Sequence, residues 1–411
     1  MKKVLAILIC LTMLVALAAC AAKTEPESSA DPSESVTEST APAESTDPET
    51  DDGTQTAGIA KEDLKIGFIH ISEPSDMGYT YNHDLGTIAM VEKLGLSEDQ
   101  VINKFNIGED ETCATAIDEL IEAGCQIIFA TSFGHGDYMA EAAAAHPDVE
   151  FSHATGSGAA ASGLPNFHNY FTSIYEARYL TGIAAGLKLN ELSETKLGYV
   201  AAFPFAEVIS GYTAFYLGAK SVTSDVTMDV IYTNSWNDPV MEAQVAQTLI
   251  DSGCKVISQH SDSTAPATTA ENNGVFQVGY NADMIPAAPN ASLISARSDW
   301  GIYLTFAVQS VIDGTPIPTD WSQGLAEGAV YLSPLNTAIA APGTEDAINK
   351  AGAALINGDL HVFDGPLSGS GITYGGDTET IDIAAGDWFH ESETQSAPYW
   401  FYIIDGIKEI V

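Results

Sequence analysis

LIEAGCQIIFATS, residues 120–132, occurs a second time in this chain, as LIDSGCKVISQHS at residues 249–261. Each copy is expected to contain the end of a helix, a turn and a strand. The Gly adopts the left-handed conformation that ends a helix at low cost. The apolar run after it does not alternate with polar residues, which is typical of a strand buried on both faces of a parallel sheet. Since a helix followed by a buried strand is half of a βαβ unit, each copy predicts an α/β fold.

Two shorter stretches repeat in the same order. KIGFI at residues 65–69 returns as KLGYV at 196–200, and GYT at 78–80 returns at 211–213. The chain is therefore predicted to contain two structurally similar, doubly wound α/β halves. Ligands of open parallel sheets bind beyond the carboxyl ends of the strands. The loops that follow the strands are therefore the first place to look for a site.

Composition limits the classes of protein. The chain has 411 residues, enough for two domains of ordinary size, and 45% of them are hydrophobic, which supports sizeable cores. Its 15 basic and 56 acidic residues give a formal charge of −41. Such a charge argues against binding nucleic acid or an anionic membrane through a basic surface. The sequence has no phosphate-binding loop and no zinc-ligand spacing, so neither a cofactor nor a metal is predicted.

Residues 1–20 have the features of a lipoprotein signal peptide. Lys2 and Lys3 precede an apolar run, residues 4–19, that is too short for a comfortable transmembrane helix. The run ends in LAAC at residues 17–20, which resembles a bacterial lipobox and implies lipidation of Cys20. An ordinary signal peptide with an incidental Cys is the alternative.

Residues 21–62 are expected to be a disordered tether. They are rich in Pro, Ser, Thr and acidic residues and nearly free of large apolar ones. Such a segment cannot bury enough surface to offset the entropy of ordering it. A lipid on Cys20 followed by this tether would hold a folded domain at the extracytoplasmic face of the cell membrane.

The order of predicted strands and helices indicates two lobes that exchange segments of the chain. Residues 63–172 plus 291–326 are expected to form the first lobe, and residues 173–290 plus 327–411 the second. The Gly-rich C-terminal part, from residue 358 on, is expected to wrap the second lobe. No role is predicted for residues 366–411.

Aromatic residues stand beside polar ones in the loops at the predicted strand ends. Rings from two lobes can grip a flat ligand, while carboxylates and amides accept its N–H or O–H groups. The candidate binding residues are Tyr79, Thr80, Phe133, Phe203, Trp236, Asp262, Asn281 and Asp283. Tyr79 and Trp236 are the expected stacking groups from opposite lobes. The alternative is that the aromatic residues belong to local cores.

An acid–base site is the competing interpretation of the polar loops. Its members would be Asp76, Asp84 and Asp137 with His83 and His135. Loop Asp and His residues more often cap helices or face solvent, and the sequence has no Gly-x-Ser-x-Gly motif. No catalytic residue is therefore assigned, and the protein is not expected to be an enzyme.

Several stretches, taken together and in this order, resemble the basic membrane protein (BMP) family. They are DMGYTYNHDLG (76–86), FSHATG (151–156), YEARYLTGIAAG (175–186), LGYVAAFP (197–204), LGAKSV (217–222), NSWNDP (234–239), LIDSGCKVISQHSDS (249–263) and SDWGIYLTFAVQSVIDGT (298–315). This family contains PnrA-like substrate-binding lipoproteins of ABC importers. The resemblance covers roughly residues 64–365 and is most specific at NSWNDP and ISQHSDS.

The resemblance implies a type I periplasmic-binding fold, with two α/β lobes joined by a three-strand hinge. It also implies a purine nucleoside or purine nucleobase held in the cleft between aromatic rings, with ABC permease subunits as partners. The family carries Asp-x-Ser-Phe-Asn where this chain has DMGYT at residues 76–80. This departure affects the expected ribose contacts, so both a nucleoside and a free base stay open.

Two other functions are compatible with the sequence. The same ligand-binding chemistry would serve a surface sensor that feeds a signalling partner. A receptor for another small solute, such as a sugar, would also have this architecture. The exact ligand, the permease and the oligomeric state do not follow from the sequence.

Overall fold

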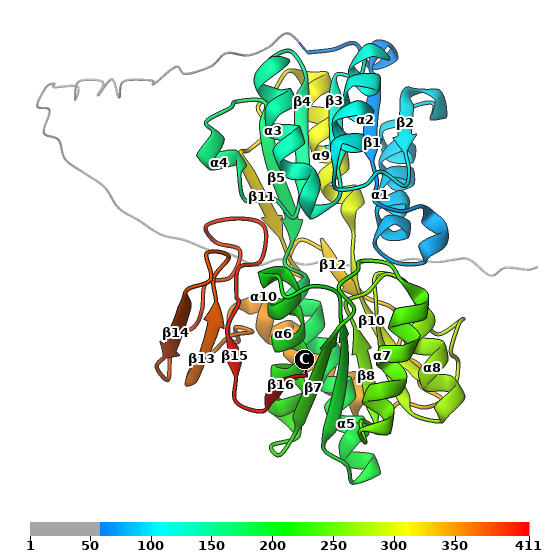
Figure 1. The fold of residues 1–411 in the computed structure, drawn as a ribbon, viewed down its shortest axis with the longest axis vertical. Coiled ribbons are helices and arrows are strands. Elements are labelled where there is room, and N and C mark those ends of the chain that lie inside the picture. Colours follow the sequence, from blue (N-terminus) through cyan, green and yellow to red (C-terminus); the bar gives the residue numbers. More distant parts are fainter. Residues whose placement is uncertain (1–57, 411) are drawn as a thin grey trace, which may run out of the picture. The chain divides into compact units, whose positions relative to one another are not determined.

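The computed structural model describes residues 58–410, which form two sheet-centred lobes and a small C-terminal sheet (Figure 1). The predicted signal peptide, Cys20 and nearly all of the predicted tether lie outside the described residues. Gly58 to Lys61 are described, and the backbone N–H of Ile59 donates to the carbonyl of Val311 in the first lobe at 3.2 Å. The first lobe therefore begins a few residues before the expected boundary at 63.

The first lobe is a six-stranded parallel sheet in the order β11-β5-β4-β3-β1-β2. Its strands are β1 (Ile66–Ile69), β2 (Val101–Lys104), β3 (Ile127–Ala130), β4 (Glu150–Ala154), β5 (Phe167–Thr172) and β11 (Asp320–Gln323). Helices α1 (Tyr79–Leu94) and α9 (Trp300–Asp313) cover one face, and α2 (Glu111–Glu122) and α3 (Gly136–Ala145) cover the other. The short helix α4 (Ala159–Ser162) and four 3₁₀ turns complete it: η1 (Lys61–Asp63), η2 (Pro74–Asp76), η3 (Glu98–Gln100) and η4 (Phe133–His135).

The second lobe is a seven-stranded sheet in the order β12-β10-β9-β8-β6-β7-β16, in which β12 alone is antiparallel. Its strands are β6 (Lys196–Ala201), β7 (Thr227–Tyr232), β8 (Val256–Gln259), β9 (Phe276–Tyr280), β10 (Ser292–Ser298), β12 (Val330–Leu332) and β16 (Ile407–Glu409). Helices α5 (Ile174–Leu192) and α6 (Ala206–Val222) cover one face, with α10 (Thr344–Asn357) packed on α5. Helices α7 (Pro239–Asp251) and α8 (Ala265–Asn273) cover the other.

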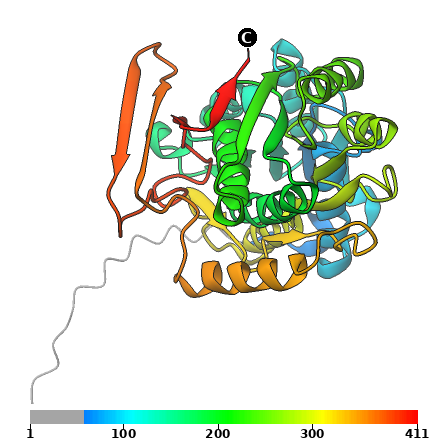
Figure 2. The same ribbon diagram turned by 90° about the horizontal axis from the view of Figure 1, so that it is seen from below.

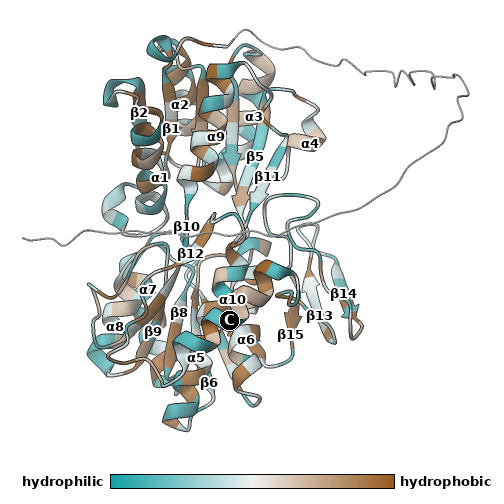
Figure 3. Cartoon of the chain, turned by 180° about the vertical axis from the view of Figure 1, so that it is seen from behind, coloured by the Kyte–Doolittle hydropathy of each residue, from teal (hydrophilic) through white to brown (hydrophobic). Residues whose placement is uncertain are grey.

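The repeated stretch has the same structure in both lobes. Helix α2 ends before Gly124, whose φ is +85°, and helix α7 ends before Gly253, whose φ is +99°. Strands β3 and β8 follow, and every residue of both strands is buried. Each lies beside the first strand of its own lobe, β1 or β6. The predicted pair of doubly wound α/β lobes is confirmed, and Figure 3 shows hydrophobic residues gathered on the central strands.

The chain passes between the sheets three times, as a three-strand hinge requires. The crossings follow β5, follow β10, and join β11 to β12. The expected boundary at residue 291 is wrong, because β10 pairs with β9 and β12 in the second sheet. The crossing at this point comes after Ser298 instead. A mostly buried strand is compatible with either sheet, so the sequence pattern did not show which one β10 joins.

The C-terminal part wraps the second lobe, as expected (Figure 2). Strand β16 extends the second sheet by pairing in parallel with β7. A separate sheet contains β13 (Leu367–Ile372), β14 (Thr378–Ile383) and β15 (Ile403–Ile404). Trp400 is fully buried in the core of the second lobe, where its ring stacks on Phe363 at 4.7 Å. Among residues 58–410, no helix is long and apolar enough to cross a membrane.

Candidate functional site

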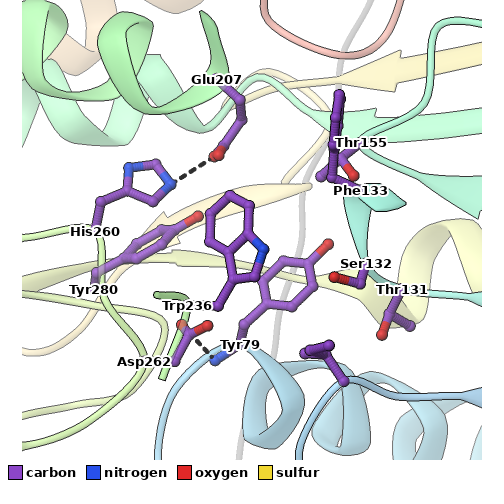
Figure 4. Close-up of a pocket in the computed structure, with 11 residues that line it drawn as sticks. Tyr79, Thr131, Ser132, Phe133, Thr155, Glu207, Trp236, His260, Asp262 and Tyr280 are labelled. Atoms are coloured by element: carbon purple, nitrogen blue, oxygen red, sulfur yellow. Dashed lines mark hydrogen bonds and ion pairs between the residues drawn. The ribbon is translucent and has the colours of Figure 1, made fainter. Parts of the chain in front are cut away.

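A pocket lies between the two lobes, where the carboxyl ends of their parallel strands face each other (Figure 4). This is the edge at which an open α/β sheet binds ligands. The first lobe contributes Ile71, Tyr79, Thr131, Ser132, Phe133 and Thr155, and the second contributes Glu207, Trp236, His260, Asp262 and Tyr280.

Aromatic rings from both lobes form the walls. Tyr79 begins helix α1 of the first lobe, and Trp236 follows β7 of the second. The Trp236 ring is held by Phe203, which meets it edge-on at 5.0 Å. Phe133 of the first lobe stacks on Phe205 of the second at 4.9 Å, so aromatic contacts continue across the cleft.

Two buried polar atoms of these walls have no hydrogen-bond partner among residues 58–410. They are the hydroxyl of Tyr79 and the indole Nε1 of Trp236, and both side chains line the pocket (Figure 4). Buried polar groups are nearly always hydrogen-bonded in folded proteins. The indole nitrogen is only a donor, so a molecule that satisfies it must offer an acceptor.

A buried arginine supports the polar side of the pocket. Arg178 of helix α5 is fully buried and donates from Nη1 to the carbonyl of Gln259 at 2.7 Å. Its Nη2 lies 3.1 Å from Nδ1 of His260, and its guanidinium lies 3.5 Å from the centre of the Tyr280 ring.

This contact assigns the tautomer of His260, since Nδ1 must accept from arginine and Nε2 then carries the proton. Nε2 lies 2.8 Å from Oε1 of Glu207, although the angle between the two groups does not make a hydrogen bond. Burial lowers the pKa of His260, and the nearby Glu207 partly opposes this effect. A neutral His260 therefore joins the buried positive charge of Arg178 to a carboxylate that faces the pocket.

Asp262 joins the two lobes. Its Oδ1 accepts from the backbone N–H of Tyr79 at 3.0 Å and from Nδ2 of Asn281 at 3.2 Å. Its own backbone N–H donates to the carbonyl of Trp236. Burial raises the pKa of Asp262 well above its usual range, and the nearby Asp76 and Glu242 carboxylates raise it further.

The lobes are in contact in this structure. Besides Asp262, Nδ2 of Asn237 in the second lobe donates to Oγ of Ser72 in the first at 3.2 Å. The pocket has about 370 Å³ of space including its open mouth.

The structure brings half of the predicted binding residues into the pocket. Tyr79, Phe133, Trp236 and Asp262 line it. The other four do not line it: Phe203 supports Trp236, Asn281 donates to Asp262, Thr80 is buried in helix α1, and Asp283 accepts from the backbone N–H of Ile285.

Sequence reasoning missed Glu207, His260 and Tyr280 as lining residues. His260 directly follows β8 within the repeated stretch, Tyr280 ends β9, and Glu207 is in the first turn of helix α6, which follows β6. The strand-end positions of His260 and Tyr280 could have identified them from the sequence as candidates for the site. Arg178 carried no such signal, because it lies within a helix.

Two residues of the competing acid–base site, Asp76 and His83, have separate structural roles. Asp76 accepts from the backbone N–H groups of Gly78, Thr80 and Tyr81 at the start of helix α1. The ring of His83 stacks on Trp300 at 4.2 Å. Neither lines the pocket, and residues 58–410 contain no cluster of His, Cys, Asp and Glu arranged to hold a metal ion.

Comparison with known proteins identifies the family. The sequence profile of the PnrA-like ABC transporter substrate-binding proteins (Bmp) matches residues 64–358. The chain belongs to this family. A purine-binding protein of Brucella abortus is 37% identical over 317 residues, which are 76% of this chain and 86% of the relative. A putative ABC transporter glucose-binding protein of Haloferax volcanii is 31% identical over 316 residues, 77% of each chain.

Solved structures share the fold. An ABC transporter solute-binding protein from Aeropyrum pernix aligns with a TM-score of 0.62 at 17% identity, covering 73% of this chain and 93% of that one. Another, from Conexibacter woesei, aligns with a TM-score of 0.59 at 18% identity, covering 72% and 98%. These neighbours confirm the predicted periplasmic-binding fold.

Membership of the Bmp family makes this protein the substrate-binding component of an ABC transport system. A small-molecule ligand and a permease are the partners that this role implies, and the family acts outside the cytoplasm. The predicted resemblance to the family is confirmed. The match to the family profile ends at residue 358, so the C-terminal sheet lies beyond the matched residues.

Proposed function

We propose that this Bmp-family protein binds a purine nucleoside or purine nucleobase in the cleft and delivers it to an ABC permease without altering it chemically. One observation carries the proposal: Tyr79 and Trp236 approach the same pocket from opposite lobes, each with an unpartnered buried polar atom. A flat ring that also carries hydrogen-bond acceptors fits this arrangement. The purine-binding relative from Brucella abortus supports this ligand class.

The polar groups match a purine in kind. The Nε1–H of Trp236 requires an acceptor, and because it lies in the plane of its ring it would donate to a group beside a stacked base, such as a ribose oxygen. Acidic side chains can accept from exocyclic amino groups, ring N–H groups or ribose hydroxyls, and the second lobe supplies Glu207 and Asp262 to the pocket. The hydroxyl groups of Thr131 and Ser132 donate to the carbonyl of Ile69 and to Glu109, so in this arrangement they can only accept from a ligand. Base and ribose recognition are both within reach of these groups.

Binding would act by closing the lobes. A ligand that touches both lobes has its full set of contacts only in the closed form, so it shifts the population toward that form. The three crossings between the sheets provide the hinge. The closed form would then be the one that the permease recognises.

We also propose that a lipid on Cys20 holds the protein at the extracytoplasmic face of the cell membrane. The LAAC stretch at residues 17–20 and the acidic Ser/Thr/Pro-rich segment after it support this. An anchor of this kind keeps the receptor close to its permease.

A sugar is the second candidate ligand. Thr131, Ser132 and Thr155 place three hydroxyl-bearing side chains on the first-lobe side of the pocket, and aromatic walls also suit the apolar face of a sugar ring. The glucose-binding name of the relative from Haloferax volcanii favours this candidate.

Calorimetric titration of the full-length chain in mild detergent tests both candidates. Adenosine, inosine, adenine, hypoxanthine and glucose are the ligands to compare. The expected result is binding of at least one purine, and binding of glucose alone would reject the purine proposal. Binding of bases without nucleosides would assign the site to nucleobases.

Variants locate the ligand. Trp236→Ala should raise the dissociation constant about 5- to 150-fold, because stacking of a base on an aromatic ring is worth about 1–3 kcal/mol. Trp388→Ala is the matched control, since Trp388 stacks on His361 in the C-terminal part and does not line the pocket. Unchanged affinity in both Trp236→Ala and Asp262→Ala would show that the ligand binds elsewhere.

A further inference from the structure

The C-terminal hairpin, β13 and β14, extends from the second lobe to the mouth of the cleft. Its base is firmly attached. Strand β13 pairs with β15, and the following strand β16 joins the second sheet. Trp400, just before β15, is buried in the second-lobe core. Its turn is closed by two backbone hydrogen bonds of 2.9 Å, from Thr373 N–H to Asp377 and from Gly376 N–H to Thr373. The turn is therefore held by the second lobe.

Tyr374 in this turn contacts both lobes. Its ring lies 6.3 Å from that of Phe133 in the first lobe, with an angle of 16° between the planes, and 6.1 Å from that of Phe205 in the second. Phe133 lines the pocket and stacks on Phe205. The Tyr374 side chain is 72% exposed, so it is no part of a core. It covers the outer side of an aromatic pair that bridges the lobes.

We propose that Tyr374 is an affinity-determining residue of the cleft, which holds the closed form together around a bound ligand. The inference rests on the proposed function and assigns a role to the segment that follows the family-matched residues. Tyr374 moves with the second lobe and Phe133 with the first, so their contact exists only when the lobes are closed. The contact therefore stabilises the closed form and leaves the open form unchanged.

The expected kinetic effect follows from this difference. Ligand release requires the lobes to separate, so loss of the Tyr374 contact should speed dissociation. The size should be about two- to tenfold, the range that one aromatic pair provides. Association should change little, because the ligand enters the open form.

The test measures dissociation of adenosine from the full-length chain by stopped flow, in wild type and three variants. Tyr374→Ala should release adenosine about two- to tenfold faster, whereas Tyr374→Phe keeps the ring and should behave as wild type. Ile372→Ala is the matched control, because Ile372 belongs to the same hairpin and is 71% exposed without an aromatic contact to Phe133. An unchanged rate in Tyr374→Ala, or an equal rise in Ile372→Ala, overturns the inference.

A second measurement separates this inference from the choice of ligand. Hydrogen exchange of the amides in residues 131–136 and 203–208 reports opening of the cleft mouth in protein without added ligand. These amides should exchange about two- to tenfold faster in Tyr374→Ala than in Ile372→Ala. If no purine binds, the purine proposal fails while this measurement still decides the role of Tyr374. Equal exchange in the two variants overturns it.

Discussion

Gly78→Ala should weaken ligand binding by opposing closure of the lobes. Gly78 precedes helix α1 of the first lobe and lies against Asp262 of the second. A Cβ at this position would lie 2.6 Å from Cα, 2.6 Å from Cβ and 2.8 Å from the carbonyl carbon of Asp262. Two of these atoms are backbone, so rotation of one side chain does not relieve the clash. The lobes must separate instead.

The magnitude follows from the cost of overpacking. Forcing one extra carbon into a tight contact costs about 1–3 kcal/mol. The clash affects only the closed form, so this cost is subtracted from the binding free energy, and the dissociation constant should rise about 5- to 150-fold. The hydrogen bond from the N–H of Tyr79 to Asp262 spans the same contact and should lengthen with it.

Calorimetric titration with the purine that binds wild type measures the effect, and thermal unfolding without ligand measures the fold. Gly158→Ala is the matched control, since a Cβ at Gly158 has no neighbour within 4 Å. The expected result is weaker binding by Gly78→Ala with a nearly unchanged melting temperature, and no effect of Gly158→Ala. Wild-type affinity in Gly78→Ala would show that the ligand-bound lobes do not meet at Asp262, which would refute the closure argument.

Two predictions concern charges buried near the cleft and the hinge. Arg178→Met should lower the free energy of unfolding, measured with urea, by about 1–3 kcal/mol, because the carbonyl of Gln259 and Nδ1 of His260 lose their donor. Arg297→Met is the control. It removes one hydrogen bond from a half-buried side chain and should lower the free energy of unfolding by less. Burial raises the pKa of Glu176 to about 7 from 4.5, so the folded state binds the proton more tightly than the unfolded state. This contribution to stability is present below pH 4.5 and is lost as pH rises to about 7, about 3 kcal/mol in all. Glu176→Gln should remove that part of the pH dependence, and an identical pH profile in the variant would show that the pKa of Glu176 does not change on folding.

The fold could be predicted from the sequence because the patterns that indicate it lie within short stretches of the chain. A Gly after an amphipathic helix and an unbroken apolar strand identify a βαβ half wherever they occur, and they occur twice. The sequence did not predict which sheet β10 joins, because a mostly buried strand suits either sheet. The pairing of β16 with β7 brings together residues about 180 positions apart in the chain. Non-local pairings of this kind leave no periodic pattern in a single sequence.

Part of the candidate site could also be predicted, because the position of a residue at a strand end can be recognised from a short stretch of sequence. Strand-end position predicts proximity to the cleft, which Tyr79, Trp236 and Asp262 confirm by lining the pocket. It does not predict side-chain direction, and Phe203 therefore supports the wall while Glu207, four residues later, lines it. Arg178 acts from a helix behind the pocket. Only the packed structure shows that support.

The charges around the pocket also limit its ligands. The lining residues include the acidic side chains of Glu207 and Asp262 and no Lys or Arg. The buried Arg178 lies behind the lining, and its two terminal nitrogens already contact Gln259 and His260. A phosphate group brought into this pocket would lose its water and meet the Glu207 carboxylate without a lining cation to pair with, which is unfavourable at low dielectric. An uncharged base or nucleoside has no such cost, so a site that recognises a purine as proposed would exclude its phosphorylated forms.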